Sequence, residues 1–161
     1  MEESFFGKLK ALVILYSPLI VVTLFSLFLS LGFMRAPHEF AYRFMGFFLV
    51  IFSLFKWIDI KGFMAAFAEY DLVSKFFKPY LIIYPALEFM IGYSYLQMDF
   101  LLICNILTIA IMGINGISVG KALINKKKIN CACLGTSVKL PLTVVSIFES
   151  ILMLTMAAMM L

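Results

Sequence analysis

The sequence has few charged residues, and this scarcity decides its class. Only 14% of the 161 residues are charged, whereas 64% are hydrophobic. In an average soluble domain about a quarter of the residues are charged. Several apolar runs approach the roughly 20 residues that a helix needs to cross a bilayer. The composition therefore excludes an ordinary soluble domain, and we expect an all-α integral membrane protein with a single domain over residues 1–161.

Catalytic signatures and soluble segments are also missing. The chain has no HExxH, P-loop, GxSxG or GxGxxG motif, no low-complexity tract and no second cysteine pair. No stretch resembles a cleaved signal peptide, so we expect the first apolar run to remain in the mature protein. The net charge of +4 does not indicate nucleic acid, because the lysines lie at the ends of apolar runs, where they orient helices. These absences favour an auxiliary protein over a stand-alone enzyme.

Five apolar segments predict a bundle of about five transmembrane helices, at residues 11–33, 40–58, 80–96, 100–124 and 141–161. Residues 59–78, between the second and third, mix charges with the apolar side chains Phe63, Phe67, Leu72, Phe76 and Phe77. Phe63 and Phe67 lie four residues apart, as do Leu72 and Phe76. This spacing predicts one interfacial amphipathic helix, with a membrane-dipping loop as the alternative. The gap at residues 97–99 is so short that the third and fourth spans form a helical hairpin.

The basic residues predict the orientation of the spans. With five alternating spans, all eleven lysines fall on one side of the membrane and the two arginines, Arg35 and Arg43, on the other. The positive-inside rule places the lysine-rich side in the cytoplasm. The N-terminus and the loop between the last two spans are then inside. If one predicted span is wrong, this loop changes sides.

Ionisable residues inside a span are costly to keep and indicate function. Glu88 and Glu149 each lie eight residues beyond the start of their predicted spans, roughly 12 Å from the cytoplasmic surface at 1.5 Å per residue. Lys56 ends the second span near that depth, Asn115 lies between, and Tyr84 shares a helix face with Glu88. We expect these five residues to form an intramembrane polar site. Lys56 neutralises one carboxylate there, and burial favours the protonated form of the other.

The fourth predicted span carries a stripe of mostly polar side chains. Asn105, Thr108, Met112 and Asn115 follow one another at steps of three, four and three residues. Asn and Thr hydrogen bond across helix bundles, so packing between helices explains this stripe. A functional role is the alternative.

Two of the three cysteines, Cys131 and Cys133, lie one residue apart among lysines in the loop before the last span. A CxC pair can come within disulfide range in a tight turn, and such a small, strained ring exchanges easily. Nearby positive charge favours the reactive thiolate. The same thiolates suit Cu(I) or half of a Zn site. The third interpretation is that both cysteines are small residues in a turn.

Other metal ligands are remote from this pair. His38, the one histidine, lies in the loop on the opposite side of the predicted membrane, and Cys104 lies near the far end of the fourth span. A metal at Cys131 and Cys133 therefore needs a partner protein or a second copy of the chain. We interpret Cys104 by itself as a small apolar core residue.

Residues 47–93 and 131–150 resemble the MauE/DoxX group of redox-associated membrane proteins. The matching features are a lysine and then an aspartate after the second span, "GF…F..YD", "YP..E" and "C.CLG…KLP". The resemblance covers about residues 44–161, and the first span matches more loosely. The matching positions in this chain are Lys56, Asp59, Tyr70, Asp71, Tyr84, Pro85, Glu88, Cys131, Cys133, Gly135, Lys139, Pro141 and Glu149.

The resemblance implies a four-helix DoxX-like core plus an N-terminal span, in the bacterial cytoplasmic (inner) membrane. It implies that Cys131 and Cys133 are the catalytic redox pair. The pair would support disulfide formation in a partner such as a methylamine dehydrogenase subunit, alongside a thioredoxin-like protein. Such maturation takes place in the periplasm, whereas the lysines place the cysteines inside. A partner must then pass reductant across the membrane, or the topology differs.

A quinone is the cofactor that the resemblance suggests, and membrane lipid is expected around the chain. A homo-oligomer is an open alternative to a single copy. Two other functions also stay open from the residues. One is soft-metal (Cu or Zn) handling or transport by Cys131 and Cys133, and the other is a structural subunit of a membrane oxidoreductase complex.

Overall fold

The computed structural model describes the backbone of residues 2–124 and 142–161. It describes the side chains of residues 17, 19–122, 124 and 147–161. Within these ranges the chain forms six helices and no strand, which confirms the all-helical class. The helices are α1 (Glu2–Phe33), α2 (Glu39–Ile58), α3 (Ile60–Tyr70), α4 (Tyr80–Gln97), α5 (Leu101–Ile124) and α6 (Leu142–Met159).

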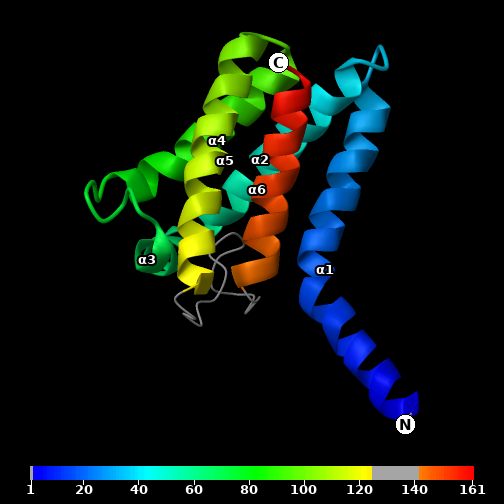
Figure 1. The fold of residues 1–161 in the computed structure, drawn as a ribbon. Coiled ribbons are helices and arrows are strands. Elements are labelled where there is room, and N and C mark those ends of the chain that lie inside the picture. The colour runs from blue at the N-terminus through cyan, green and yellow to red at the C-terminus, as the bar shows by residue number, and fades with distance from the viewer. Residues whose placement is uncertain (1, 125–141) are drawn as a thin grey trace.

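The five longer helices run alternately up and down, and the short α3 lies beside one end of α4 and α5 (Figure 1). Contacts are most extensive between α2 and α4 and between α5 and α6. Smaller contacts join these two pairs, through α4 with α5, α2 with α6, and α3. The helix α1 packs against α2, and its N-terminal end extends beyond the other helices (Figure 1). The bundle is therefore two helix pairs with α1 added beside α2.

Two glycines bring α2 and α4 into close contact. A Cβ atom built on Gly92 of α4 would lie 3.0 Å from the carbonyl oxygen of Gly46 and 3.0 Å from Cβ of Leu49. A Cβ built on Gly46 would lie 2.9 Å from the carbonyl oxygen of Gly92. Small residues at the contact between membrane helices let the backbones approach in this way. The close packing of this pair thus depends on both glycines.

The helix α3 is shorter than the amphipathic helix that we expected over residues 59–78. It begins after Asp59, whose Oδ1 accepts a hydrogen bond from the Gly62 N–H at 3.1 Å, and it ends at Tyr70. Asp71 is extended, with φ −67° and ψ 137°, and its Oδ2 accepts a hydrogen bond from the Ser74 N–H at 2.6 Å. This local bond favours a turn, and the residues from 71 to 79 form turns instead of further helix.

The apolar face of α3 packs against protein. Phe63 and Phe67 are each 1% exposed, and their rings lie 6.1 Å and 4.7 Å from the ring of Tyr84 on α4. The expected apolar residues beyond α3 are placed differently, because Phe76 is 93% exposed and Phe77 is 52% exposed. The apolar spacing in residues 59–78 therefore combines a buried helix face with an exposed turn.

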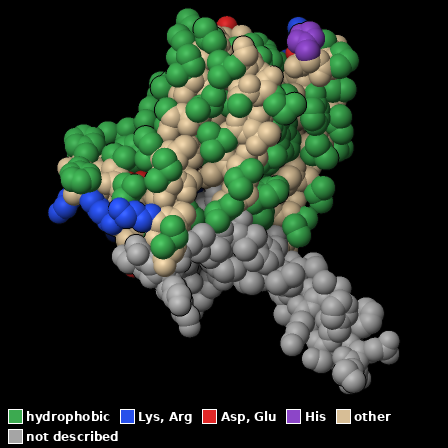
Figure 2. Space-filling model, in the orientation of Figure 1, with side chains coloured by type: hydrophobic (Ala, Val, Ile, Leu, Met, Phe, Trp, Pro, Cys, Tyr) green, Lys and Arg blue, Asp and Glu red, His purple; other side chains and the backbone are tan. Residues whose placement is uncertain are grey.

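The surface of the described bundle is rich in hydrophobic side chains (Figure 2). Two of the described helices are long and apolar enough to cross a membrane, at Glu39–Ile58 and Leu101–Ala122. Shorter apolar stretches lie in α1, at Leu19–Phe33, and in α6, at Ile147–Met159. These features indicate a membrane protein, and the count of five spans stays a prediction.

Candidate functional site

Three charged side chains meet inside the bundle, one each from α2, α4 and α6. Nζ of Lys56 lies 2.5 Å from Oε2 of Glu88 and 3.9 Å from Oε1 of Glu149. Each of the three residues is about 1% exposed. The structure thus brings together the three ionisable residues of the predicted polar site, here called the charged triad. Because Glu149 belongs to the other helix pair, the triad spans the boundary between the pairs.

Local sequence positions each member of the triad. Lys56 lies in the last turn of α2, where a cation interacts favourably with the helix dipole. Glu88 follows Tyr84 by four residues on α4, so both side chains leave the same face of the helix. Pro85 is buried between them and has no N–H to donate within the helix. Glu149 lies two turns into α6, which begins at Leu142.

Two aromatic rings cover the lysine. Nζ of Lys56 lies 4.9 Å from the centroid of the Tyr84 ring and 5.8 Å from that of Phe63. Both distances are within the range of a cation–π interaction. Phe63 comes from α3, so the apolar face of this short helix closes the site. The sequence placed Tyr84 in the site, whereas it gave no signal for Phe63 beyond its apolar spacing.

Among the described residues, the triad holds two carboxyl groups and one cation. If both carboxyl groups were ionised, the buried cluster would carry a net charge of −1, which is costly in a medium of low polarity. Oε1 of Glu88 makes no hydrogen bond to any described residue. The site therefore gathers two carboxyl groups and one ammonium group where water has little access.

Asn115 lies next to the triad and is not a member of it. Its Nδ2 donates a hydrogen bond to Oγ of Ser150 at 3.3 Å, and Ser150 directly follows Glu149 on α6. A Cβ on the neighbouring Gly116 would lie 3.6 Å from Cβ of Ser150, an ordinary contact distance. Asn115 therefore fixes α5 against α6 beside Glu149. Sequence reasoning did not identify Ser150, which carries no functional signal of its own.

A second polar cluster lies at the other end of the bundle. The hydroxyl of Tyr95 donates to Oδ1 of Asn105 at 2.7 Å and lies 3.1 Å from Oγ1 of Thr108. Nδ2 of Asn105 donates to the carbonyl oxygen of Met160 at 3.1 Å. We call these four residues the neutral cluster. Its bonds join α4 and α5 to the end of α6, which supports the packing explanation for the polar stripe of α5.

The remaining described motif positions have local structural roles. Asp59 caps the start of α3, and Asp71 forms the turn that follows it. Tyr70 is buried, with its ring edge-on to Phe67 at 5.4 Å. Two residues weighed as metal ligands lie apart from the site: His38 is exposed before α2, and the buried Sγ of Cys104 donates to the carbonyl oxygen of Asp99 at 3.8 Å.

The predicted redox pair, Cys131 and Cys133, lies outside the described residues, as do Gly135, Lys139 and Pro141. These residues belong to the segment that joins α5 to α6. In the part of the chain that is described, no group of three His, Cys, Asp or Glu side chains could hold a metal ion.

The family model described as methylamine utilisation protein MauE matches residues 34–161. The match begins directly after α1 and contains α2 to α6 with the whole triad. Comparisons with curated proteins and with solved structures gave no match. The likeness to DoxX relatives stays a prediction. The matched range covers most of the sequence, and the chain therefore belongs to the MauE family.

Proposed function

We propose that this chain is a multi-pass component of the bacterial cytoplasmic membrane that takes part in thiol–disulfide exchange. It supports disulfide formation in a partner protein of methylamine utilisation. Membership of the MauE family supports the link to methylamine. The observation that carries the chemical part is the buried triad, in which Lys56 lies within ion-pair distance of both Glu88 and Glu149.

The placement of the triad along the helices supports a connection to the cysteine pair. Lys56 ends α2 and Glu149 lies seven residues, about 10 Å, beyond the start of α6. The end of α2 and the start of α6 lie at the same end of the bundle (Figure 1). α5 ends and α6 begins at that end of the bundle, and Cys131 and Cys133 lie between these two helices in the sequence. In the proposed five-span topology, the cysteine pair is on the lysine-rich, cytoplasmic side, so the partner that exchanges directly with the pair relays the exchange across the membrane to the periplasm.

The proposed exchange has two balanced steps. First, the Cys131–Cys133 disulfide is reduced while two thiols of the partner are oxidised to a disulfide. Second, the disulfide of a thioredoxin-like protein is reduced while the cysteine pair is oxidised again. In each step a thiol loses its proton before it attacks, and the leaving thiolate gains one. The proposed role of the triad is to take up and return this proton.

The described residues of the triad do not fit a quinone head group. Each side chain is about 1% exposed, and Lys56, the one cation of the triad, already pairs with both carboxyl groups. We therefore assign the role of electron acceptor to the thioredoxin-like partner.

The redox state of the pair in cells tests this proposal. Cells are acid-quenched and free thiols are labelled with a mass-tagged maleimide, in a Cys104→Ser background that removes the third thiol. We expect a pair that is partly oxidised and becomes reduced when cells receive a reductant. With Cys133→Ser or Cys131→Ser, we expect a trapped mixed disulfide with the partner. Glu149→Gln slows the exchange, whereas Tyr95→Phe, a buried change in the neutral cluster, does not.

Three other outcomes contradict the proposal. A pair that stays reduced under every condition rules out exchange. Copper or zinc that co-purifies, and is lost in the Cys131→Ser/Cys133→Ser variant, supports soft-metal handling instead. Wild-type maturation of the partner by both single cysteine variants supports a structural subunit.

A further inference from the structure

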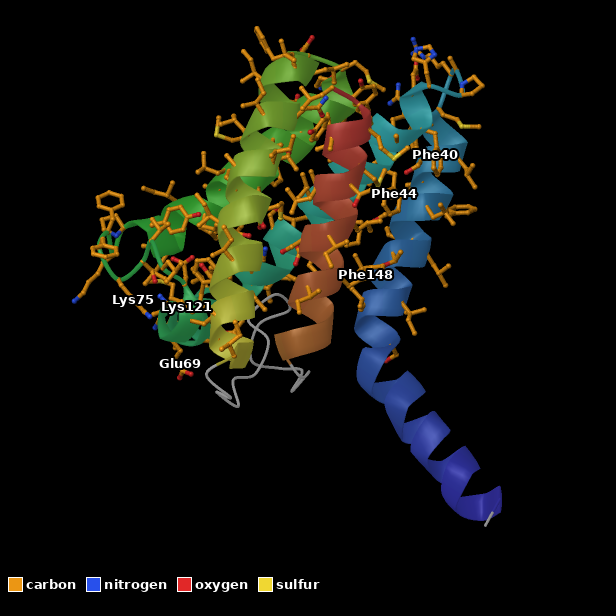
Figure 3. The ribbon with its side chains drawn as sticks, in the orientation of Figure 1. Phe40, Phe44, Glu69, Lys75, Lys121 and Phe148 are labelled. Atoms are coloured by element: carbon orange, nitrogen blue, oxygen red, sulfur yellow. The ribbon has the colours of Figure 1, made fainter. Side chains whose placement is uncertain are left out.

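A small hollow of about 40 Å³ lies where the turn after α3 meets the end of α5. Its lining includes Lys75 of the turn, Lys121 and Ser118 of α5, and Glu69 of α3. Figure 3 shows Lys75 and Lys121 side by side at this edge of the molecule, near Glu69. The three charged side chains give the hollow a net charge of +1.

Hydrogen bonds connect the turn that contains Lys75 to the helix that contains Lys121. Oγ of Ser118 accepts a hydrogen bond from the Leu72 N–H at 3.2 Å and donates one to the carbonyl oxygen of Ile114 at 2.9 Å. The buried Asp71 fixes the next part of the turn through the Ser74 N–H. The backbone of the turn with Lys75 is thus attached to the helix with Lys121, which fixes where the two lysine side chains start.

The same turn exposes two aromatic side chains. Phe76 is 93% exposed and Phe77 is 52% exposed, and Lys75 and Lys78 flank them. The N–H groups of both phenylalanines bond to the carbonyl oxygen of Val73, which keeps the turn compact. Figure 2 shows hydrophobic side chains next to a group of basic ones at this edge. Exposed aromatic rings beside lysines are typical of segments that lie in the headgroup region of a membrane.

We propose that this hollow binds the phosphate group of an anionic phospholipid. The phosphodiester lies between Lys75 and Lys121, and the acyl chains lie beside Phe76 and Phe77. A phosphodiester carries one negative charge, which matches the net charge of +1 of the hollow. Lysines bind phosphate as point charges, and basic pockets between membrane helices bind lipid headgroups. The site is separate from the triad and does not depend on the proposed redox function.

Native mass spectrometry of the full chain in a neutral detergent tests the headgroup site. We expect phosphatidylglycerol to bind more tightly than phosphatidylcholine. The variant Lys75→Gln/Lys121→Gln should lose this preference by about fivefold for each lysine removed. Lys61→Gln, at an exposed lysine of α3 that does not line the hollow, is the matched control and keeps the preference. Equal binding of both lipids, or an unchanged preference in the double variant, overturns the proposal. It is also overturned if inorganic phosphate competes at the concentration at which the lipid binds.

A fluorescence measurement tests the aromatic part and does not depend on removing lysines. The chain has one tryptophan, Trp57, so the variant Trp57→Phe/Phe76→Trp reports only the turn. In vesicles that contain phosphatidylglycerol, we expect brominated acyl chains to quench this tryptophan and aqueous iodide to leave it bright. Strong quenching by iodide with none by brominated lipid shows that the turn lies in water, and the proposal is then wrong.

Discussion

The two buried polar clusters of this bundle share the helices α4 and α6 and differ in chemistry. The neutral cluster joins α4 and α5 to α6 through hydrogen bonds from Tyr95 and Asn105. The charged triad joins α2 and α4 to α6 through Lys56, Glu88 and Glu149. The neutral cluster contains no ionisable group that is charged at neutral pH. The triad contains three, one acid in excess.

This difference separates packing from function. Hydrogen bonds between uncharged groups account for helix association by themselves, at modest energies for each bond. A buried ion cluster gives no such advantage, because apolar residues of similar volume are often as stable or more stable. Stability therefore explains the neutral cluster and does not explain the triad. The predictions below test this distinction, from the largest expected effect on stability to the smallest.

Removing the cation should have the largest effect. Lys56→Met leaves two buried carboxyl groups without their partner, and we expect it to lower the free energy of unfolding by about 3–5 kcal/mol. Thermal unfolding in detergent, followed by size-exclusion chromatography, measures this loss. The double variant Lys56→Met/Glu88→Leu, which removes the pair together, should recover most of it. If Lys56→Met is as stable as the parent protein, the contacts of Lys56 do not stabilise the bundle.

The second largest loss of stability should come from the contact between α2 and α4, which lies between the two clusters along α4. Gly92 lies one turn after Glu88 and one turn before Leu96, and a Cβ there would lie 3.0 Å from the backbone of Gly46. We expect Gly92→Ala to cost about 1–3 kcal/mol, because the α2 backbone must move. Gly113→Ala on α5 is the matched control, since a Cβ there meets nothing within 4 Å. In the same unfolding assay, equal stability of the two variants contradicts the close packing of α2 on α4.

A change in the neutral cluster should lower the stability of the protein and leave thiol exchange unchanged. Tyr95→Phe removes the hydroxyl that contacts Asn105 and Thr108, at a cost of about 1 kcal/mol. We expect the redox state of the cysteine pair to stay as in the parent. Tyr93→Phe, at an exposed tyrosine whose hydroxyl accepts only from Gln97 among the described residues, is the control and should be neutral. An altered thiol state in Tyr95→Phe shows that the neutral cluster is also functional.

The sequence predicted parts of this arrangement that depend on local geometry. A helix has a fixed rise per residue, so counting from the span starts placed Glu88 and Glu149 at one depth, close to the end of α2. The structure brings both carboxyl groups to Lys56. The helical class was also predictable, because a helix satisfies all the backbone hydrogen bonds of a long apolar segment within a membrane.

Features that depend on contacts between distant residues could not be predicted. The apolar spacing of residues 59–78 is the same whether a face meets lipid or protein, so it did not reveal that Phe63 covers Lys56. It also continued past the true end of α3, where the bond between Asp71 and Ser74 favours a turn. The hydrogen bond between Asn115 and Ser150 depends on the packing of α5 against α6, which the spacing within either helix does not show.

The smallest effect on stability should accompany the largest effect on chemistry. Glu149→Gln keeps the shape of the side chain and removes the excess acid, so we expect a change of less than about 1 kcal/mol in the free energy of unfolding. Glu88→Gln, the matched control, breaks the 2.5 Å ion pair and should cost more. The triad would then have no proton to exchange in Glu149→Gln, so the rate of thiol exchange should fall, and the pH dependence that remains should be that of the cysteine thiols alone.

Measuring both properties of Glu149→Gln decides between the two explanations of the triad. Stability is followed by thermal unfolding, and exchange by the rate at which mass-tagged maleimide labelling of the cysteine pair responds to added reductant. A variant that is stable and exchanges slowly assigns Glu149 to the chemistry. A variant that is unstable but exchanges at the parent rate assigns it to packing, and the triad then belongs with the neutral cluster. The two clusters differ in function only if Glu149→Gln is stable and exchanges slowly. A buried acid that does not stabilise the fold is then explained by its part in thiol exchange.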